Sequence, residues 1–562
     1  MRKHGIVRPD DVRNPKNRIL NADFWGEIGY NLEMAMIETR RIRKLNPATG
    51  QPLQDYPVAS TEEVTDAVVK SRRAFADFRT ASLKTRARLL KAIAELLYRR
   101  ADTLAAVISE ETGKPISDSL EADIGTALAI LHYYAEIGPK TLRPRTISPD
   151  LTSQITGRLH RETFHPRGAI AVISPWNYPL AIPASGLTAA LMTGNTAILK
   201  PSELTPATGK TLVELIQEAL SNLNLPLDTV QVLIGDGQTG AELIETDIDG
   251  VIFTGSDRTG QKIREVTGGR GLWNSLELGG SDAMIVLDGC DLEKAASYAV
   301  WGRFVNAGQA CASVKRLLVP ARSVETILKH LEHKMSKLCV GPPNDTTCHV
   351  GPLISETQLN LLEAQVRDAI EQGARLVMGG QRLDMPGWFY APTLLANVPA
   401  SARMLHEEVF GPALPVIPYH HVDDAIRLAN DSDFGLTTSL FGPTSKAKAL
   451  AGRLECGTVV INDVGPSNYA MVSAPWGGWK NSGAGVSHGE RSLLEFSRSQ
   501  VVSENLCFSL PWFNKPFWHF GPDATLVPAR SKAVLAVSGR QSAMWHPKTW
   551  LAFWNHRASK KL

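Results

Sequence analysis

Cys311, Glu277 and Asn177 are the three side chains of this 562-residue sequence whose types and surroundings best suit covalent chemistry on a carbonyl group. Cys311 lies among small residues (308–313, GQACAS), which would leave its thiol accessible to a carbonyl compound. Because the thiolate is the nucleophilic form, an accessible cysteine is a candidate for attack on a carbonyl carbon. On the local sequence alone, a small buried hydrophobic residue is the commoner alternative.

Glu277 and Asn177 offer the base and the hydrogen-bond donor that such an attack requires. Glu277 ends an apolar run and precedes two glycines (276–280, LELGG). Partial desolvation there would raise the pKa of its carboxyl group toward the range of a general base, and the alternative is a cap or a salt bridge. Asn177 lies between two prolines (175–179, PWNYP), so its amide could donate to an oxyanion or satisfy a turn.

Other stretches suit a dinucleotide. Gly255 and Gly260, in the stretch FTGSDRTG, follow an expected strand and precede an expected helix, so the backbone can approach a pyrophosphate there. A P-loop would need lysine where the chain has Gln261, and this disfavours ATP. Lys200 and Glu203 end another expected strand and could hold ribose hydroxyls. The later stretch EEVFGP offers a carboxylate beside an aromatic ring for a second ribose and a nicotinamide.

These residues are far apart in sequence, and the hydrophobic pattern predicts a scaffold that can bring them together. From Thr61 to about Tyr134 the apolar residues recur at helical spacing. Short apolar runs then alternate with helical stretches, which indicates a parallel sheet covered on both faces. The predicted strands are 169–173, 196–199, 230–234, 251–253 and 283–287.

Two regions depart from that alternation. The uncharged run from Gly168 to Leu199 is long enough for a membrane span, but its three prolines would disrupt a lipid-exposed helix. We therefore interpret it as a buried strand, loop, helix and strand. The segments 154–164 and 500–508 have the pattern of solvent-facing strands, and we expect them to pair into a small separate sheet.

Taken in order, the motifs PWNYP, KPSE, FTGS, LELGG, GQAC and EEVFGP closely resemble the aldehyde dehydrogenase superfamily. Their order, and the 34-residue spacing from Glu277 to Cys311, make the resemblance specific, and it extends from about Asn46 to Phe496. It implies an α/β fold with a Rossmann-like dinucleotide-binding domain, an α/β catalytic domain and a small β oligomerisation extension.

The resemblance also implies a domain order and an assembly. The expected parts are an N-terminal extension (1–44), an NAD-binding domain (45–280) interrupted by an oligomerisation hairpin (about 143–165), a catalytic domain (281–480), a return to the NAD-binding domain with an oligomerisation strand (481–510) and a Trp-rich basic tail (511–562). A homodimer or homotetramer is expected from family analogy and from the pairing of the two solvent-facing segments.

By the same resemblance, Cys311 is the nucleophile and Glu277 activates the water that hydrolyses a thioester. Asn177 and the backbone amide of Cys311 form the oxyanion hole. Glu203 would contact the adenosine ribose, and because a carboxylate there repels a 2′-phosphate, NAD is favoured over NADP. The remaining residues expected against the cofactor are Ser174, Trp176, Lys200, Ser202, Gly255, Ser256, Gly260, Leu278, Gly279, Glu408 and Phe410.

Tyr178, Ile182 and Trp476 would by family analogy line an apolar substrate entrance. No positive charge lies between Asn177 and Leu199 to hold a second carboxylate, so we expect an apolar aldehyde rather than succinate semialdehyde. Two other functions stay open, an acylating dehydrogenase that uses coenzyme A and a non-catalytic scaffold. An intact Glu277 disfavours the first, and the complete set of three catalytic residues disfavours the second.

The composition is that of a globular protein, with 60 basic and 57 acidic residues and 43% hydrophobic residues. Residues 45–510 carry a net charge of −8, which gives no reason to expect nucleic acid as a partner. The tail 511–562 holds 8 basic residues, 1 acidic residue and 5 of the 12 tryptophans. It would either contact a membrane surface peripherally or pack on the body or a neighbouring subunit.

Six scattered cysteines without a C-x-x-C pair, and a polar N-terminus, favour a reduced, cytoplasmic setting, with membrane association through the tail as a further option. The histidine clusters at 330–333 and 420–421 do not form a zinc motif, so no metal is expected.

Overall fold

The computed structural model describes residues 40–150, 153 and 157–506. The chain divides into two units, Met1–Arg41 and Ile42–Leu562, and the helices and larger sheets among the described residues lie in the second. The tail 511–562, with its membrane hypothesis, and residues 1–39 of the expected extension 1–44 fall outside the described residues.

Helices precede the first long strand, as the apolar spacing predicts. They are α1 (Thr61–Phe78), α2 (Leu83–Arg99), α3 (Ala101–Thr112), α4 (Ile116–Asp118) and α5 (Thr126–Thr141), with a π-helical turn, Ser119–Gly125, between the last two. A capping box starts α1, because the Ser60 hydroxyl accepts from the Glu63 amide while the Glu63 carboxylate accepts from the Ser60 amide. The predicted helical lead-in is confirmed.

A six-stranded sheet follows, in the order β19-β9-β8-β5-β6-β7. Its strands are β5 (Ala169–Ile173), β6 (Thr196–Lys200), β7 (Val230–Val232), β8 (Gly250–Thr254), β9 (Trp273–Glu277) and β19 (Gly483–Ala484). All pairs are parallel except β19 with β9. The helices that connect or follow these strands are α7 (Ala181–Thr193), α8 (Pro206–Asn222), α9 (Gly237–Glu245) and α10 (Asp257–Arg270). The predicted α/β class is confirmed.

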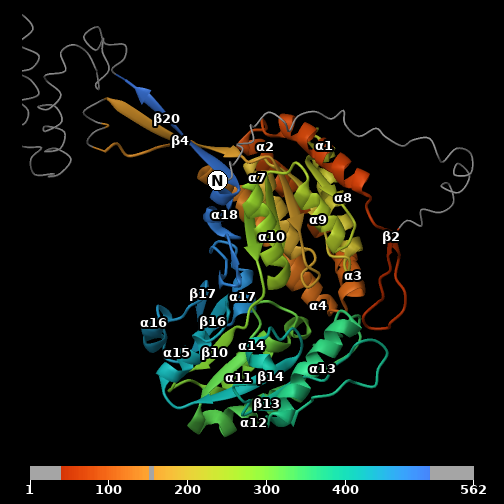
Figure 1. Cartoon of the computed structure of the whole chain (residues 1–562), viewed down its shortest axis with the longest axis vertical. Coiled ribbons are helices and arrows are strands. Elements are labelled where there is room, and N and C mark those ends of the chain that lie inside the picture. The colour runs from red at the N-terminus through yellow and green to blue at the C-terminus, as the bar shows by residue number, and fades with distance from the viewer. Residues whose placement is uncertain (1–39, 151–152, 154–156, 507–562) are drawn as a thin grey trace, which may run out of the picture. The chain divides into compact units, whose positions relative to one another are not determined.

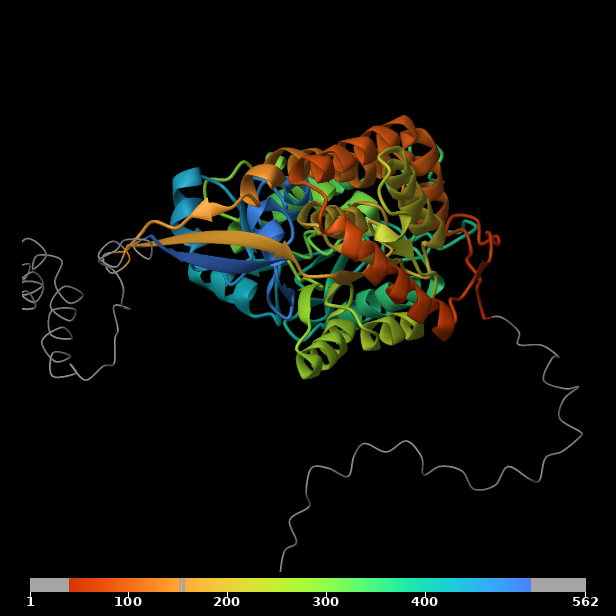
Figure 2. The same ribbon diagram turned by 90° about the horizontal axis from the view of Figure 1, so that it is seen from above.

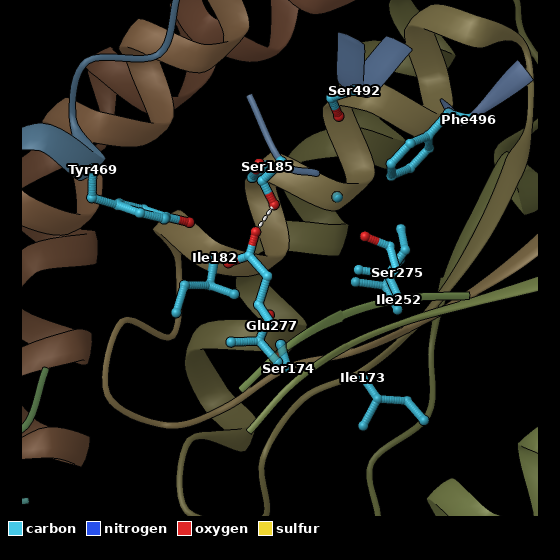
Figure 3. A pocket seen from close by; sticks show the side chains of 14 residues that line it. Ile173, Ser174, Ile182, Ser185, Ile252, Ser275, Glu277, Tyr469, Ser492 and Phe496 are labelled. Carbon is cyan, nitrogen blue, oxygen red and sulfur yellow. Dashed lines mark hydrogen bonds between the residues drawn. The ribbon is translucent and has the colours of Figure 1, made fainter. Parts of the chain in front are cut away.

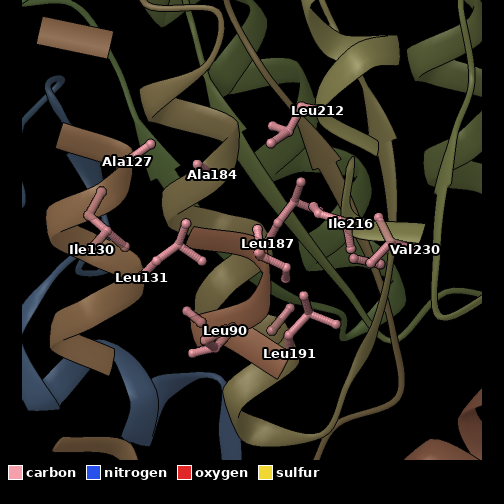
Figure 4. Packing of buried hydrophobic residues seen from close by; sticks show 14 of the residues in the cluster. Leu90, Ala127, Ile130, Leu131, Ala184, Leu187, Leu191, Leu212, Ile216 and Val230 are labelled. Carbon is pink, nitrogen blue, oxygen red and sulfur yellow. The ribbon is translucent and has the colours of Figure 1, made fainter. Parts of the chain in front are cut away.

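Helix α7 explains the uncharged run from Gly168 to Leu199. Every residue of α7 is buried, and its leucines pack with side chains of α2, α5 and α8 (Figure 4). Leu187 and Leu191 are 1% exposed, and burial of each such side chain contributes about 1.5–3 kcal/mol. The run is therefore core, and no helix among the described residues is long and apolar enough to cross a bilayer.

A seven-stranded sheet carries the second half of the chain, in the order β12-β13-β14-β11-β10-β16-β17. Its strands are β10 (Ala283–Val286), β11 (Arg316–Pro320), β12 (Arg375–Met378), β13 (Thr393–Ala396), β14 (Ala413–Tyr419), β16 (Thr437–Phe441) and β17 (Thr458–Ile461). They are parallel except for the β12 edge. The helices are α11 (Leu292–Phe304), α12 (Val324–Met335), α13 (Glu356–Glu371), α14 (Arg403–His406), α15 (Val422–Asn430), α16 (Thr444–Ala451) and α17 (Gly465–Tyr469).

A third, small sheet joins segments more than 330 residues apart, as expected from their alternation. Strand β20 (Ser497–Asn505) pairs antiparallel with β4 (Arg158–Pro166), with Ser497 opposite Pro166 and Asn505 opposite Arg158. Strand β3 (Arg145–Thr146) flanks β4. Figures 1 and 2 show β4 and β20 side by side, extending away from the helices and the larger sheets. The pairing predicted for 154–164 and 500–508 is confirmed for 158–163 with 500–505, and residues 154–156, 507 and 508 lie outside the described residues.

The remaining elements are short. They are β1 (Arg41–Ile42), β2 (Tyr56–Pro57), β15 (Phe434–Gly435), β18 (Trp479–Lys480) and α18 (Gly489–Glu495). The domain boundaries expected at 45, 281 and 481 stay a prediction.

Candidate active site

Cys311 follows a turn with an unusual backbone. Asn306, Ala307 and Gly308 have φ angles of 52°, 53° and 74°, so three successive residues are left-handed. Each non-glycine residue in this conformation costs about 1–2 kcal/mol. A Cβ atom at Gly308 would lie 2.4 Å from the Gly411 carbonyl oxygen, so glycine is required there. Such strain persists only where the surroundings fix the turn.

Cys311 has apolar neighbours. Cys311 and Tyr469 both pack against a buried cluster of Ala312, Leu436 and Trp476. Burial raises the pKa of the thiol to about 12, and the charges of three carboxylates add to this effect. One of them is Glu277, so the predicted nucleophile and base lie within electrostatic range of each other.

Lys315 is the cation beside this thiol. Its buried ammonium donates to the Cys311 carbonyl oxygen (2.6 Å) and to Glu408 Oε1 (2.6 Å). The positive charge lowers the pKa of the thiol, against the larger effect of burial. Lys315 therefore ties the nucleophile's backbone to one of the predicted cofactor residues.

Glu277 ends β9, and its side chain is buried. Burial raises the pKa of its carboxyl group to about 7, while a hydrogen bond donated by the Ser487 hydroxyl to Oε1 lowers it. Figure 3 shows the carboxylate pointing into a narrow cavity that Ser174, Ile182, Ser185 and Tyr469 also line. A carboxylate with a pKa near neutrality can both accept and release a proton under physiological conditions.

Asn177 lies on the loop between β5 and α7, where backbone and side-chain contacts hold it. Its side-chain Nδ2 donates to the Gln309 carbonyl oxygen at 3.0 Å. Its own carbonyl oxygen accepts from Lys114 Nζ (2.7 Å) and from Asn306 Nδ2 (2.9 Å). Because a primary amide has two N–H donors, one remains for an oxyanion.

The predicted adenosine-side residues meet at the carboxyl end of β6. Lys200 is buried, and its Nζ lies 3.4 Å from Glu203 Oε2, whose side chain is 47% exposed. The Ser174 amide donates to the Lys200 carbonyl oxygen (3.1 Å), and the Ser174 hydroxyl is buried without a partner. The Ser202 hydroxyl accepts from the Leu204 amide. An exposed carboxylate at a strand end suits ribose hydroxyls.

The predicted pyrophosphate residues start α10. The Ser256 hydroxyl caps this helix by accepting from the Thr259 amide (3.3 Å). A Cβ atom at Gly260 would lie 2.4 Å from Leu278, and one at Gly255 equally close to the Phe253 ring. Glycine thus permits close packing of helix and strand beside a helix N-terminus, an arrangement that fits an anionic group.

Glu408 and Phe410, the residues predicted against the nicotinamide and its ribose, lie near Lys315: its Nζ is 2.6 Å from Glu408 Oε1 and 5.7 Å from the centroid of the Phe410 ring. Glu408 Oε1 accepts from Lys315 and from the Gly280 amide (3.1 Å). A Cβ atom at Gly279 would lie 2.4 Å from Glu408 Oε2, so glycine keeps that approach open. The Phe410 ring meets the Trp176 ring edge-on, with centroids 5.4 Å apart. The residues predicted for the adenosine ribose, the pyrophosphate and the nicotinamide ribose therefore all fit a bound dinucleotide.

The three predicted substrate residues have different neighbours. The Trp476 ring packs edge-on against Tyr469 (centroids 5.3 Å), within the cluster that holds Cys311. Tyr178 follows Asn177 in the chain, and Lys114 Nζ lies 4.3 Å from the centroid of its ring. Ile182 lines the cavity of Glu277.

Several side chains of the site were missed from the sequence. Lys114, Asp123 and Asn306 form hydrogen bonds around Asn177, Ser487 binds Glu277, and Lys315 lies beside the thiol. Lys315 lies four residues after Cys311, a spacing that could have suggested it. Lys114, Asn306 and Ser487 are more than 60 residues from the group they contact at the site, and Asp123 is 57 residues from Leu180, so local sequence gives no signal for them. No group of three His, Cys, Asp or Glu residues that could hold a metal occurs within the described part of the chain.

Comparison with known proteins shows what the chain as a whole is similar to. The model of the aldehyde dehydrogenase family matches residues 35–502. A 4,4′-diapolycopene aldehyde oxidase from Methylomonas sp is 39% identical over 459 residues, covering 81% of this chain and 84% of that protein. A succinate-semialdehyde dehydrogenase [NADP(+)] from Deinococcus radiodurans is 35% identical, covering 82% and 94%. The crystal structure of a Mycobacterium tuberculosis aldehyde dehydrogenase complexed with NAD+ has a TM-score of 0.78 and 31% identity, covering 83% and 94%.

Proposed function

The chain belongs to the aldehyde dehydrogenase family, whose members oxidise aldehydes with NAD or NADP, and from this premise we propose that it converts an apolar aldehyde to the free carboxylic acid with NAD. Cys311, Glu277 and Asn177 carry the reaction. The observation that carries the proposal is the buried Glu277 carboxylate, with a pKa of about 7, within electrostatic range of the Cys311 thiol.

In the first half-reaction the Cys311 thiolate adds to the aldehyde carbon. The charge of Lys315 favours the thiolate, against the burial that opposes it. The carbonyl oxygen becomes an oxyanion, which accepts from the free N–H of Asn177 and from the Cys311 amide. The nicotinamide, when bound, supplies the acceptor for the hydride. Cys311 is left as a thioester.

In the second half-reaction Glu277 takes a proton from water, and the resulting hydroxide attacks the thioester carbon. The carbon–sulfur bond breaks, and the carboxylic acid and the Cys311 sulfur are released. The Ser487 hydroxyl supports this role because its hydrogen bond favours the charged form of Glu277.

NADH formation across an aldehyde panel, with product analysis, tests this proposal. We expect the free acid as the product with or without coenzyme A, and no turnover by Cys311→Ala. An acyl-coenzyme A product, or turnover that survives Cys311→Ala, would reject the hydrolytic mechanism or its nucleophile.

The preference for NAD rests on Glu203. Its side chain is 47% exposed, and its carboxylate can accept from the 2′- and 3′-hydroxyls of a ribose but repels a 2′-phosphate. Lys200 is the neighbouring cation, and its buried ammonium is directed at this carboxylate.

An apolar substrate is supported by what surrounds the thiol. Tyr469, Trp476, Leu436 and Ala312 give Cys311 an aromatic and aliphatic surface. The buried Lys315 ammonium is already hydrogen bonded to a carboxylate and a carbonyl, so it does not serve as an anchor for a second substrate carboxylate. The similarity to a protein named 4,4′-diapolycopene aldehyde oxidase supports the same class. Comparable kcat/KM for succinate semialdehyde and a long aliphatic aldehyde would contradict it.

A further inference from the structure

Lys114 is a fully buried cation that no step of the mechanism uses. It follows α3, and its Nζ donates to Asp123 Oδ2 (2.6 Å) and to the Asn177 carbonyl oxygen (2.7 Å). The same nitrogen lies 4.3 Å from the centroid of the Tyr178 ring. A buried ammonium is tolerated only where its charge and its N–H groups find partners. Here a carboxylate, a carbonyl and an aromatic face supply them.

Asp123 extends this contact to the start of α7. It lies in the π-helical turn Ser119–Gly125, and its Oδ1 accepts from the amides of Leu180 and Ala181, both at 3.1 Å. The Lys114–Asp123 pair therefore holds the loop of Asn177 at two points, at the Asn177 carbonyl and at the first turn of the helix that follows. A segment fixed at both points has little freedom to rotate the Asn177 side chain.

The turn that precedes Cys311 is attached to the same carbonyl. Asn306 Nδ2 donates to the Asn177 carbonyl oxygen (2.9 Å) and to the Gln309 carbonyl oxygen (3.3 Å). Asn177 Nδ2 donates to that Gln309 oxygen as well. The Asn306 amide donates to Asp118, which lies next to the π-helical turn (3.0 Å). One connected set of buried hydrogen bonds thus joins Lys114, the oxyanion donor and the nucleophile turn.

We propose that Lys114 is a positioning residue for the oxyanion hole, whose buried ammonium, paired with Asp123, fixes the Asn177 amide relative to the Cys311 sulfur. This inference rests on the proposed function, because it acts through Asn177 as the oxyanion donor. Lys114 touches neither the substrate nor the thiol in this role. Misplacement of a reacting group by about 1 Å costs roughly 10²-fold in rate, so a distant support of the donor is detectable in the kinetics.

The test is the paired variant Lys114→Met/Asp123→Asn, which removes both charges while the asparagine oxygen can still accept from the start of α7. The cofactor-free acylation of the full-length enzyme by p-nitrophenyl acetate develops an oxyanion, whereas alkylation of Cys311 by iodoacetamide does not. We expect acylation to fall at least tenfold and alkylation to stay within twofold. The surface pair variant Lys140→Met/Glu136→Gln is the matched control, since that ion pair is solvent-exposed, and both of its rates should stay unchanged.

Equal losses in acylation and alkylation would overturn the inference, because a general distortion of the site affects both, and so would an unchanged acylation rate. If the paired variant does not fold, Lys114→Arg replaces it, because arginine keeps the positive charge but places it at a different distance from the backbone. We again expect slower acylation and an unchanged rate of alkylation.

A double-mutant cycle separates this inference from the proposed function. In an Asn177→Ala background the paired variant should lose its effect on acylation, because the donor that it positions is gone. A further tenfold loss in that background would overturn the inference alone. If the single variant Asn177→Ala is acylated at the wild-type rate, Asn177 is not the oxyanion donor, and the inference fails with that assignment.

Discussion

Burial raises the pKa of both central groups of the site, with opposite consequences for their reactivity. It raises the pKa of the Glu277 carboxyl to about 7, where a general base is most useful, and that of the Cys311 thiol to about 12, where the thiolate is scarce. The site therefore favours proton transfer at Glu277 and leaves the thiolate dependent on the charge of Lys315. We expect deacylation to be the step whose rate follows the titration of Glu277.

The pH dependence of turnover should follow the titration of the Glu277 carboxyl group. The base must be unprotonated, so kcat should rise with pH and reach half its limit near pH 7 where deacylation limits the rate. Ser487→Ala removes the hydrogen bond that favours the carboxylate, which raises the pKa of Glu277 and moves the profile to higher pH. Ser185→Ala removes another hydroxyl from the same cavity and is the control. A Ser487→Ala profile that stayed in place or moved to lower pH would contradict the assignment.

The preference for NAD over NADP should depend on one residue, Glu203. Glu203→Gln removes the charge that repels a 2′-phosphate and leaves Lys200 in place beside it. We expect the ratio of kcat/KM for NAD to that for NADP to fall at least tenfold, mainly through a lower KM for NADP. Glu214→Gln, an exposed carboxylate on α8, is the control. An unchanged ratio would remove Glu203 from the ribose site.

At the scale of elements, α7 connects the core to the site. Its residues are buried on every face, and the amides of Leu180 and Ala181 at its start donate to Asp123. The loop that carries Asn177 therefore lies between two buried elements, strand β5 and helix α7.

Truncation of the α7 core should cost stability in proportion to the cavity it creates. Leu187→Ala removes a side chain that is 1% exposed, and we expect a loss of about 2–5 kcal/mol in the free energy of unfolding. Leu361→Ala, at a position 41% exposed on α13, should stay within about 0.5 kcal/mol. Urea denaturation followed by tryptophan fluorescence measures both. Equal effects of the two variants would contradict the packing of α7.

The sequence was sufficient for the elements and for the motif residues, and insufficient for the contacts between them. Strand β5 was predicted at 169–173 because a fully buried strand is a continuous apolar run. Glu277 and Asn177 were found because each ends or follows such a run, and Cys311 was found because small residues surround it. Lys114 was not found, because its partner Asn177 lies 63 residues away and a single lysine after a helix is ordinary in local sequence. Strand β19 is two residues long and carries no periodicity at all.

At the scale of the whole molecule, the extension of β4 and β20 leaves apolar side chains uncovered. Val501 and Val502 are 55% and 50% exposed, on a strand that forms the edge of its three-stranded sheet among the described residues. An edge strand of this kind favours pairing with another chain. We propose a homodimer or homotetramer in which β20 contacts a second copy.

Association should therefore depend on β20. Val501→Glu/Val502→Glu places charges on both faces of this strand, and we expect a smaller mass than that of the wild-type enzyme by light scattering. Val69→Glu, at a position 43% exposed on α1, is the control and should leave the mass unchanged. An unchanged mass for the β20 variant would contradict the proposed interface.

The most direct test of the central claim is intact and peptide mass spectrometry of Glu277→Gln after incubation with an aldehyde and NAD. Without the base that activates water, the thioester should accumulate, so we predict about one acyl group per chain, located on the peptide that contains Cys311, and one equivalent of NADH. No adduct, or an adduct on another cysteine, would contradict a mechanism in which Cys311 carries the acyl group and Glu277 releases it.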